Sequence, residues 1–363
     1  MDKKIFEDLF ILEMANNHWG KLERGLKIIQ EFSTIVRFNN VRAAIKLQFR
    51  DVDSFIHKDF RDNKDIRYIK KTLDTKMDVE HYATMVEAIK KAGCIAISTP
   101  FDEKSVDLCV NVGIEIIKIA SSDINDWFLI EKIAKTRKPV VLSTGGSSLK
   151  DVDDVVKYFN SRNIPLAVLH CVSLYPTDDA DLDLNQIDFL KNRYPENTIG
   201  LSTHEHTDWS SSVLISYAKG ARIFERHVDI DDGEYSVSAY CSRPEQIDTW
   251  FKAHEKAVEM CGVPGNHKRM PPEAEIKYLD ALVRGVYAKR DLMKGDILKH
   301  ETIERDVYLA IPLQKGQLSC RELISGEVLV QDVKKDEPIM IDMIDSPYAK
   351  NEKLKKRIYN RGI

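Results

Sequence analysis

Residues 115–145 read EIIKIASSDINDWFLIEKIAKTRKPVVLSTG, and this stretch contains a complete unit of strand, helix and strand. The runs EIIKI and PVVL have the length and the branched side chains of buried strands. The segment between them, DWFLIEKIAKTRK, has the apolar spacing of an amphipathic helix. Strands that alternate with helices in this way predict a parallel sheet.

The same unit repeats along the first part of the chain. Eight short apolar runs occur in order, and most end in a polar or ionisable residue that a buried strand does not need. Eight strands with helices between them predict an α/β fold, a (β/α)8 TIM barrel, whose chemistry lies at the C-terminal ends of the strands. The runs are FILEMA (10–15), AAIKLQ (43–48), CIAISTP (94–100), EIIKIASS (115–122), PVVLSTG (139–145), LAVLHC (166–171), TIGLST (198–203) and ARIFERH (221–227).

The pattern changes after residue 262. Glycine, proline and charge replace periodic hydrophobicity over 263–281, which predicts a linker. Short β-like runs separated by turn signals predict a small β-rich domain over 282–346, and residues 347–363 read as a basic tail. We therefore expect a TIM-barrel catalytic domain over 1–262, followed by a second, smaller domain.

Composition excludes several classes of protein. The chain has 54 Lys and Arg against 58 Asp and Glu, a net charge of −4, and these residues are spread along it, so no nucleic-acid groove is expected. No apolar run approaches the roughly 18 residues of a membrane span, and no signal peptide pattern is present. We expect a cytoplasmic protein without membrane contact. Six cysteines without a C-x-x-C pair predict neither disulfides nor a zinc–thiolate site.

Two histidines at strand ends are candidate metal ligands. His204 follows the seventh run and His227 ends the eighth, and these strands are neighbours in a closed barrel. An isolated histidine is more often a hydrogen-bonded loop residue, but convergence of two favours a metal. Two imidazoles without thiolates suit Mn²⁺ or Mg²⁺ better than structural zinc. Such a metal acts as a Lewis acid on a carbonyl group.

Two lysines inside apolar runs are candidate anion ligands. Lys46 and Lys118 would each be costly to bury without an anion or a carboxylate nearby. Together with the hydroxyls of Ser121, Ser143 and Ser202, they predict a pocket for phosphate and carboxylate oxygens. Two other interpretations stay open. Either lysine can form an ion pair inside the barrel, or one can form a Schiff base as in class I aldolases.

Two glutamates and a tyrosine complete the candidate site. Glu13 ends the first run, where it can act as a general base or orient Lys46. Glu225 supplies a second carboxylate that compensates the cations, and either glutamate can be the ion-pair partner of a lysine. Tyr175 can donate its hydroxyl to a substrate, or it can pack in the loop after the sixth strand.

Motifs throughout the chain resemble those of one known family. The correspondences, in chain order, are FILEMANNHWG with AE-x-G-x-NHNG, AIKLQ with VKFQ, STPFD, LHCVSLYPT with LLHCT-x-x-YP, IGLSTHE with GYSDHT, and IFERHVDID with IEKHFTLD. The segment VRGVYAKRDLMKGDILKHETI resembles an antifreeze-like (SAF) domain of the β-clip type. The chain thus resembles the sialic acid synthase (N-acetylneuraminate synthase) family, which has a phosphoenolpyruvate-condensing barrel followed by an SAF domain.

The resemblance implies a C–C bond-forming transferase. It would condense phosphoenolpyruvate with an acyclic amino-sugar aldehyde, N-acetylmannosamine or a related hexosamine, to give a nine-carbon 2-keto-3-deoxy acid and phosphate. It also implies a domain-exchanged homodimer. Carried over by motif, the metal ligands are His204 and His227, the phosphoenolpyruvate ligands are Lys46, Lys118, Ser121, Ser143 and Ser202, the catalytic residues are Glu13, Lys46, Lys118 and Glu225, and the sugar-binding residues are Asn63, Asp123, Tyr175 and Glu225.

The sequence departs from the family mainly where the sugar is held. Thr203 stands where the family has Asp, Asp123 replaces a Glu, and the loop 231–242 lacks the family's aspartate. The segment 305–317 lacks the arginine that reaches an N-acetyl group. We therefore expect an acceptor other than N-acetylmannosamine, such as a legionaminic- or pseudaminic-type precursor or an unacetylated sugar. The alternatives are a 3-deoxy-octulosonate or heptulosonate type of synthase and a non-catalytic sugar-binding barrel.

Overall fold

The computed structural model describes residues 3–63, 65–263, 265, 268–322 and 326–363. These residues form two compact units, Met1–Pro264 and Gly265–Ile363, which are described separately. None of the helices in these ranges is long and apolar enough to cross a membrane.

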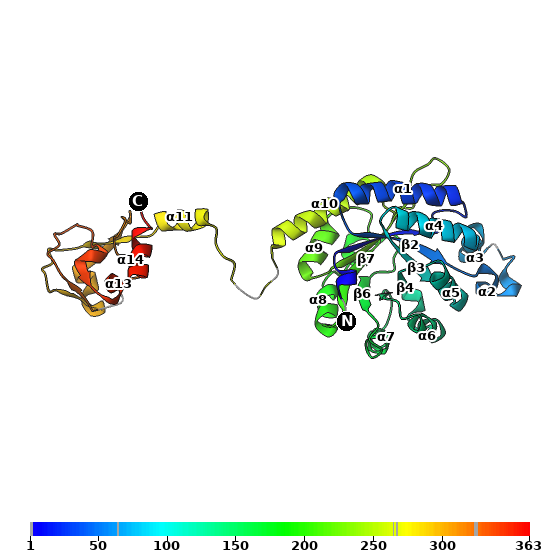
Figure 1. Ribbon diagram of the computed structural model, residues 1–363, viewed down its shortest axis with the longest axis horizontal. Helices are drawn as coiled ribbons and strands as arrows, with labels where there is room; N and C mark the ends of the chain where they lie inside the picture. Colours follow the sequence, from blue (N-terminus) through cyan, green and yellow to red (C-terminus); the bar gives the residue numbers. More distant parts are fainter. Residues whose placement is uncertain (1–2, 64, 264, 266–267, 323–325) are drawn as a thin grey trace. The chain divides into compact units, whose positions relative to one another are not determined.

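The first unit is a closed barrel of eight parallel strands in chain order, which confirms the predicted TIM barrel (Figure 1). The strands are β1 (Leu9–Ala15), β2 (Ala43–Phe49), β3 (Ile95–Pro100), β4 (Ile116–Ile119), β5 (Val140–Ser143), β6 (Leu166–Cys171), β7 (Thr198–Thr203) and β8 (Ile223–His227). The larger helices around them are α1 (Leu22–Asn39), α4 (Val79–Lys91), α5 (Glu103–Asn111), α6 (Trp127–Lys135), α7 (Leu149–Asn160), α8 (Gln186–Arg193), α9 (Ser211–Lys219) and α10 (Pro244–Cys261).

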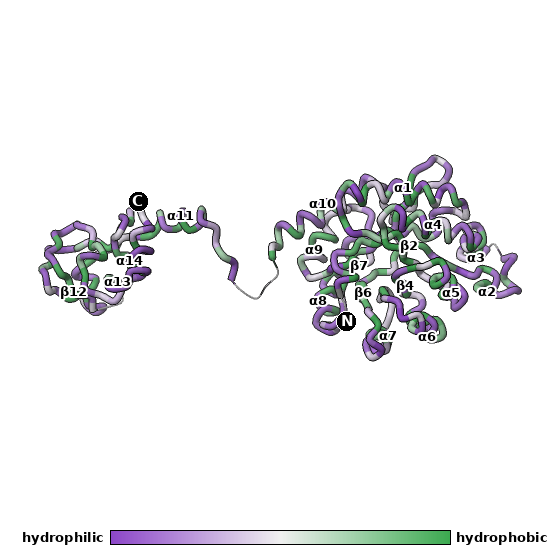
Figure 2. The backbone as a smooth tube through the Cα atoms, in the orientation of Figure 1, coloured by the Kyte–Doolittle hydropathy of each residue, from purple (hydrophilic) through white to green (hydrophobic). Residues whose placement is uncertain are grey.

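Alternation along each strand separates two cores. On β1, Phe10 and Leu12 belong to the large apolar cluster between strands and helices, whereas Leu9 and Ile11 belong to a smaller cluster inside the barrel. Because side chains alternate along a strand, Glu13 continues the inward-facing series above Ile11. The tube in Figure 2 shows the apolar strands at the centre of this unit, within more polar helices.

The same alternation places a polar layer over an apolar one on other strands. The inner cluster includes Ala44, Ile116, Val141 and Ile223, and two residues further along those strands stand Lys46, Lys118, Ser143 and Glu225. The ends of the strands thus bring charged and hydroxyl groups to one mouth of the barrel. The register agrees, since Glu13 lies beside Lys46 of β2 and beside His227 of β8.

Two longer connections, one between β2 and α4 and the other between β8 and α10, contribute residues to this mouth. The chain between β2 and α4 includes α2 (Val52–Phe55), a 3-10 turn η2 (Lys58–Phe60) and α3 (Arg67–Asp74). Shorter turns, η1 (Lys3–Phe6), η3 (Ser121–Asp123) and η4 (Asp179–Asp181), occur elsewhere in this unit. The segment between β8 and α10 is held to the β1–α1 connection by stacking of Tyr235 on Trp19, with ring centroids 4.7 Å apart.

The second unit is small and β-rich. It contains a three-stranded sheet in the order β10-β12-β13 and a two-stranded sheet, β11-β9, both antiparallel. Its elements are α11 (Glu273–Ala281), β9 (Gly285–Ala288), β10 (Ile297–Leu298), η5 (His300–Thr302), α12 (Ile303–Asp306), β11 (Val307–Ala310), β12 (Glu327–Leu329), η6 (Ile341–Met343), β13 (Ile344–Asp345), α13 (Pro347–Lys350) and α14 (Glu352–Tyr359).

Two segments at the edges of this unit differ from the prediction. The stretch 263–281 was expected to be a linker, but its second half forms the helix α11. The basic tail 347–363 was expected to be a solvated segment or a surface helix; it forms the helices α13 and α14, and Ile358 is buried in the apolar core of the unit. Ala349 is partly buried against the same core, and the few apolar residues of the tail did not indicate this packing.

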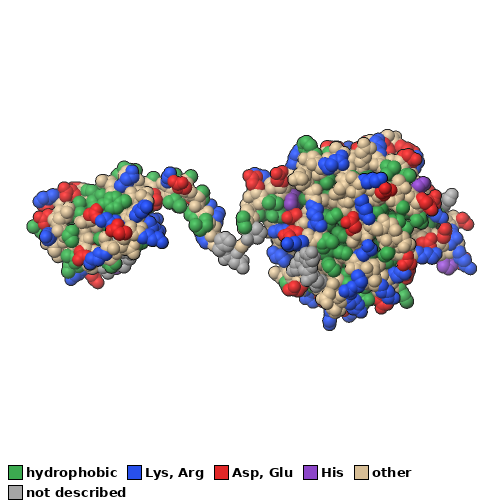
Figure 3. All heavy atoms as spheres, viewed as in Figure 1, with side chains coloured by type: hydrophobic (Ala, Val, Ile, Leu, Met, Phe, Trp, Pro, Cys, Tyr) green, Lys and Arg blue, Asp and Glu red, His purple; other side chains and the backbone are tan. Residues whose placement is uncertain are grey.

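The described surface mixes charges of both signs. On the face shown in Figure 3, Lys and Arg side chains alternate with Asp and Glu over both units. Ion pairs such as Lys150–Asp154 and Lys252–Asp248 join neighbouring turns of helices.

Candidate active site

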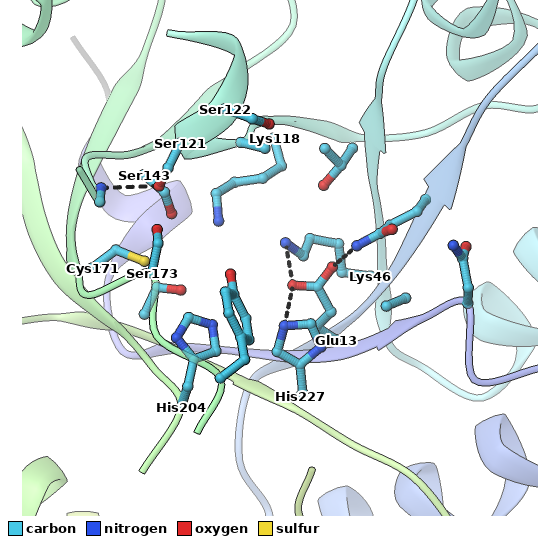
Figure 4. Close-up of a pocket in the computed structure, with 18 of the residues that line it drawn as sticks. Glu13, Lys46, Lys118, Ser121, Ser122, Ser143, Cys171, Ser173, His204 and His227 are labelled. Carbon is cyan, nitrogen blue, oxygen red and sulfur yellow. Dashed lines mark hydrogen bonds and ion pairs between the residues drawn. The ribbon is translucent and has the colours of Figure 1, made fainter. Parts of the chain in front are cut away.

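A cavity of about 590 Å³ opens at the C-terminal ends of the barrel strands (Figure 4). This volume is within the usual range for small-molecule sites. Ten of the twelve predicted site residues line it, from seven different strands or the loops that follow them: Glu13, Lys46, Lys118, Ser121, Ser143, Tyr175, Ser202, His204, Glu225 and His227.

Four charged side chains form an ion-pair cluster at the base of the cavity. Lys46 Nζ lies 2.7 Å from Glu13 Oε2 and 3.0 Å from Glu225 Oε2. Lys118 Nζ lies 2.6 Å from Glu225 Oε1, which also accepts a hydrogen bond from Ser202 Oγ at 2.9 Å. Each of the four charged residues is at most 4% exposed. The ion pair that the sequence left as an alternative is therefore present, and the cluster balances two ammonium groups with two carboxylates.

The cluster keeps both carboxylates ionised. Burial alone opposes their charge, but Lys46 and His227 lower the pKa of Glu13, and Lys118 and Lys46 lower the pKa of Glu225 well below its usual range. Burial lowers the pKa of Lys118, whereas Glu13 and Glu225 outweigh burial and raise that of Lys46. The pKa values of the two lysines therefore shift in opposite directions, and Lys118 loses its proton more readily than Lys46.

The two histidines lie close together, and His227 is next to Glu13 (Figure 4). Their ring centroids are 5.3 Å apart, and His227 Nε2 lies 3.6 Å from Glu13 Oε2. His204 Nδ1 lies 2.9 Å from the carbonyl oxygen of Val172, which can only accept a hydrogen bond. The proton of the neutral ring is therefore on Nδ1, and the lone pair of His204 is on Nε2. Tyr175 packs on His204, with ring centroids 4.1 Å apart.

Both imidazoles are in the form that binds metals. Burial lowers the pKa of His204 to about 3, and burial also lowers the pKa of His227. Neutral imidazole is the ligating form. Among the described residues no group of three or more His, Cys, Asp or Glu side chains is arranged to hold an ion. Two neutral imidazoles in one cavity are chemically suited to serve as metal ligands, and a metal held by them would need water or substrate oxygens to complete its coordination.

Hydroxyl groups line the wall between β3 and β5. Ser121 Oγ accepts a hydrogen bond from the Gly145 amide at 2.9 Å. Ser143 Oγ and Thr99 Oγ1 are buried and have no hydrogen-bond partner. A buried hydroxyl without a partner is costly, so these two groups are suited to receive oxygens of a bound ligand. A side chain at Gly145 would lie 2.2 Å from Ser173 Oγ, so glycine lets two loops meet here.

Two predicted sugar ligands, Asn63 and Asp123, do not line the cavity. Asn63 is exposed, and its side chain accepts a hydrogen bond from the amide of Asp65 at 3.1 Å within a turn. Asp123 accepts one from Ser122 Oγ at 2.9 Å. Each of these side chains takes part in a local hydrogen bond, and their roles as sugar ligands stay predictions.

Asp123 has a testable consequence for stability. Burial, with Asp126 adding to it, raises the pKa of its carboxyl to about 6, and its Oδ2 atom has no hydrogen-bond partner. The folded state thus retains a proton that the unfolded state releases near pH 4, so this group lowers the free energy of unfolding as pH rises from about 4 to about 6. Asp123→Asn is expected to be about 2 kcal/mol more stable than wild type at pH 7.5 and equal to it at pH 4. Urea unfolding at both pH values measures this, and an equal difference at both would contradict it.

Several cavity residues were not predicted. Gln48 Nε2 donates to Glu13 Oε1 at 2.8 Å, and Arg50, Lys71, Ser173 and Tyr240 also line the cavity. Gln48 and Arg50 lie at the end of a barrel strand or just after it, where position alone indicates function. Lys71 lies on the polar helix α3, and nothing in its sequence separates it from a solvated lysine.

Comparisons with known proteins agree with this geometry. Residues 39–264 match the NeuB family, and residues 283–345 match the SAF domain. The chain is 30% identical to N-acetylneuraminate-9-phosphate synthase of Drosophila melanogaster over 93% of this chain and 96% of that one. It is 27% identical to a pseudaminic acid synthase of Campylobacter jejuni, over 84% of this chain and 87% of the relative.

A solved structure shares both units. It belongs to a Chromobacterium violaceum protein assigned by name to spore coat polysaccharide biosynthesis, with a TM-score of 0.87, 37% identity, and coverage of 94% of this chain and 100% of that one. Fold and site together define an enzyme that condenses phosphoenolpyruvate with an amino sugar. The chain belongs to the NeuB family of such synthases, with an SAF domain at its C-terminal side.

Proposed function

We propose that this synthase joins phosphoenolpyruvate to the aldehyde of an open-chain hexosamine other than plain N-acetylmannosamine, with the help of a divalent metal such as Mn²⁺ or Mg²⁺. The products are a nine-carbon 2-keto-3-deoxy acid and phosphate. The observation that supports this most directly is the convergence of Glu13, Lys46, Lys118 and Glu225 with two neutral imidazoles in one cavity.

The chemistry assigns a task to each group. Carbon 3 of phosphoenolpyruvate forms a bond to the aldehyde carbon, whose oxygen takes a proton and becomes a hydroxyl. Water then adds to carbon 2, and phosphate leaves with its bridging oxygen, so that the water oxygen becomes the new keto oxygen. Glu13 is an ionised carboxylate within the cavity and is suited to take the proton from that water.

The remaining residues bind and orient. Lys46, Lys118 and the unpartnered hydroxyls of Ser143 and Thr99 are suited to hold carboxylate and phosphate oxygens. His204 and His227 would hold the metal, which supplies Lewis-acid polarisation of the carbonyl when it is bound. The ion pair of Lys118 with Glu225 favours this binding role over a Schiff base, because a nucleophilic amine must first lose its proton.

Phosphate release from phosphoenolpyruvate, scored over a panel of aldoses, tests the proposal. The panel contains N-acetylmannosamine, mannosamine, diacetamido-dideoxyhexoses and phosphopentose acceptors, with a reaction lacking any aldose as the control. We expect the fastest release with a hexosamine other than N-acetylmannosamine. Fastest release with N-acetylmannosamine refutes the acceptor, fastest release with a phosphopentose favours the octulosonate or heptulosonate alternative, and no release with any aldose refutes the function.

Two further assays address the remaining predictions. Borohydride added during turnover should leave every lysine unmodified, and reductive labelling of Lys118 would establish the Schiff-base alternative. The domain-exchanged homodimer stays a prediction from the family resemblance, and the cytoplasmic location stays a prediction from the sequence pattern. Mass determination in solution at several protein concentrations tests the first of them.

A further inference from the structure

The charge balance of the cavity indicates that the base cluster cannot be the whole anion site. Lys46 and Lys118 are already neutralised by Glu13 and Glu225. Phosphoenolpyruvate brings a carboxylate together with a phosphate that carries between about one and a half and two negative charges near pH 7. A bound divalent metal would offset part of this negative charge, and the remainder calls for additional positive charge elsewhere in the cavity. Two lining residues that no motif singled out, Arg50 and Lys71, supply it.

Arg50 is a cation surrounded by neutral partners. Its guanidinium lies 3.7 Å from the centroid of the Phe101 ring, and one of its nitrogens donates to Gln48 Oε1 at 3.1 Å and to the Tyr68 hydroxyl at 3.0 Å. Its Nε is buried and has no hydrogen-bond partner. Among the described residues, no carboxylate forms an ion pair with Arg50. Its planar group is thus held in place with donors left for an anion.

Lys71 reaches the same cavity from α3. It is half-buried, and no carboxylate within the described ranges forms an ion pair with its ammonium. Asp229 is near enough to act on its charge, but that carboxylate is bound to Arg24 at 2.7 Å. Burial, together with the positive charges of Arg67 and Arg50, lowers the pKa of Lys71. An ammonium that burial and like charges destabilise gains most from a bound anion.

We propose that Arg50 and Lys71 form a phosphate-binding subsite, distinct from the Lys46–Lys118 cluster, that takes the phosphate monoester of a bound substrate. That the ligand of this subsite is a substrate rests on the proposed function. Two sources offer the same chemistry: the phosphate of phosphoenolpyruvate itself and a phosphate carried by the acceptor sugar. Inorganic phosphate, which the reaction releases, serves as a probe for either.

Binding without turnover is the first test. Calorimetric titration of the full chain with inorganic phosphate is compared for wild type, Arg50→Gln, Lys71→Gln and the double variant. We expect each single change to weaken binding about tenfold, because each removes a charge-assisted hydrogen bond. Lys71→Arg keeps the charge and should retain most of the affinity. The matched control is Lys70→Gln, since the neighbouring Lys70 is exposed and paired with Asp74 outside the cavity.

Steady-state kinetics distinguish the two sources. If the subsite holds phosphoenolpyruvate, the Arg50 and Lys71 variants raise KM for phosphoenolpyruvate about tenfold with every acceptor and leave the KM for a neutral acceptor unchanged. If the subsite holds the phosphate of the acceptor, the Arg50 and Lys71 variants leave the KM for phosphoenolpyruvate unchanged. They then reduce only the ratio of kcat/KM for a hexosamine 6-phosphate to that for the unphosphorylated hexosamine. Either result supports the subsite.

The proposal is overturned if the double variant, with a melting temperature equal to that of wild type, binds inorganic phosphate and both substrates as wild type does. Its failure can be separated from that of the proposed function. If wild type releases no phosphate with any aldose, but the variants still lose affinity for inorganic phosphate, the synthase assignment fails and the phosphate subsite stands.

Discussion

Replacing Glu225 by glutamine is expected to abolish phosphate release and to lower the free energy of unfolding by about 3–5 kcal/mol, the cost of breaking a buried ion pair. Glu225 binds Lys118 through one oxygen and Lys46 through the other. Glutamine keeps the size and can still accept the hydrogen bond from Ser202, but it removes one of the two charges that balance two buried ammonium groups. Folding must then either bury an uncompensated cation or remove a proton from one of the two lysines.

The functional loss has the same cause. With Glu225 neutral, Lys118 loses its closest carboxylate and is expected to shed its proton, because burial already lowers its pKa. The cavity then has one ammonium fewer for substrate oxygens. We expect a fall in kcat/KM of at least about 100-fold, from the lost charge and the displaced lysine together.

The matched control is Glu131→Gln, on the exposed surface of α6. It makes the same chemical change away from the cavity, so it should leave activity and stability as in wild type. Urea unfolding monitored by circular dichroism measures stability, and phosphate release measures activity. If Glu225→Gln unfolds at the same urea concentration as wild type and retains more than a tenth of its activity, the ion-pair cluster is required for neither stability nor catalysis.

The barrel and the base of its site could be predicted from the sequence because both depend on local patterns. Lys46 and Lys118 stand out as ionisable residues inside apolar runs, and a closed barrel requires the ends of all its strands to meet at one mouth. His204 and His227 follow from the same rule, since β7 and β8 are neighbours. The barrel topology therefore brings residues that are distant in the sequence together around one cavity.

The sequence could not predict which charged side chains form ion pairs, or how the long connections fold over the barrel. It left open whether the lysines met carboxylates or were free, and the structure shows that both are paired. Lys71 reaches the cavity only because the β2–α4 connection folds α3 against it, and the sequence of α3 does not show which part of the barrel that helix packs against. Asn63 lies in the same connection but in an exposed part of it, outside the cavity lining, and its role as a sugar ligand stays a prediction.

Removing either imidazole is expected to abolish metal binding and activity together. His204 and His227 offer neutral rings in one cavity, and no described group of three or more His, Cys, Asp or Glu side chains provides an alternative site. We expect the wild-type chain to bind one Mn²⁺ and His204→Ala to bind it at least about 100-fold more weakly, because losing one of two protein ligands costs more than losing a second-sphere partner.

Titration of free Mn²⁺ by electron paramagnetic resonance measures this binding without reference to turnover. His57→Ala is the matched control, because its imidazole is 64% exposed on another loop and lies outside the cavity. Treatment with a chelator should stop phosphate release by the wild type, and added Mn²⁺ should restore it. His204→Ala should not be restored at the same concentration of metal. Full activity of the chelated protein, or equal Mn²⁺ affinity in wild type and His204→Ala, would show that these two rings do not hold a catalytic metal.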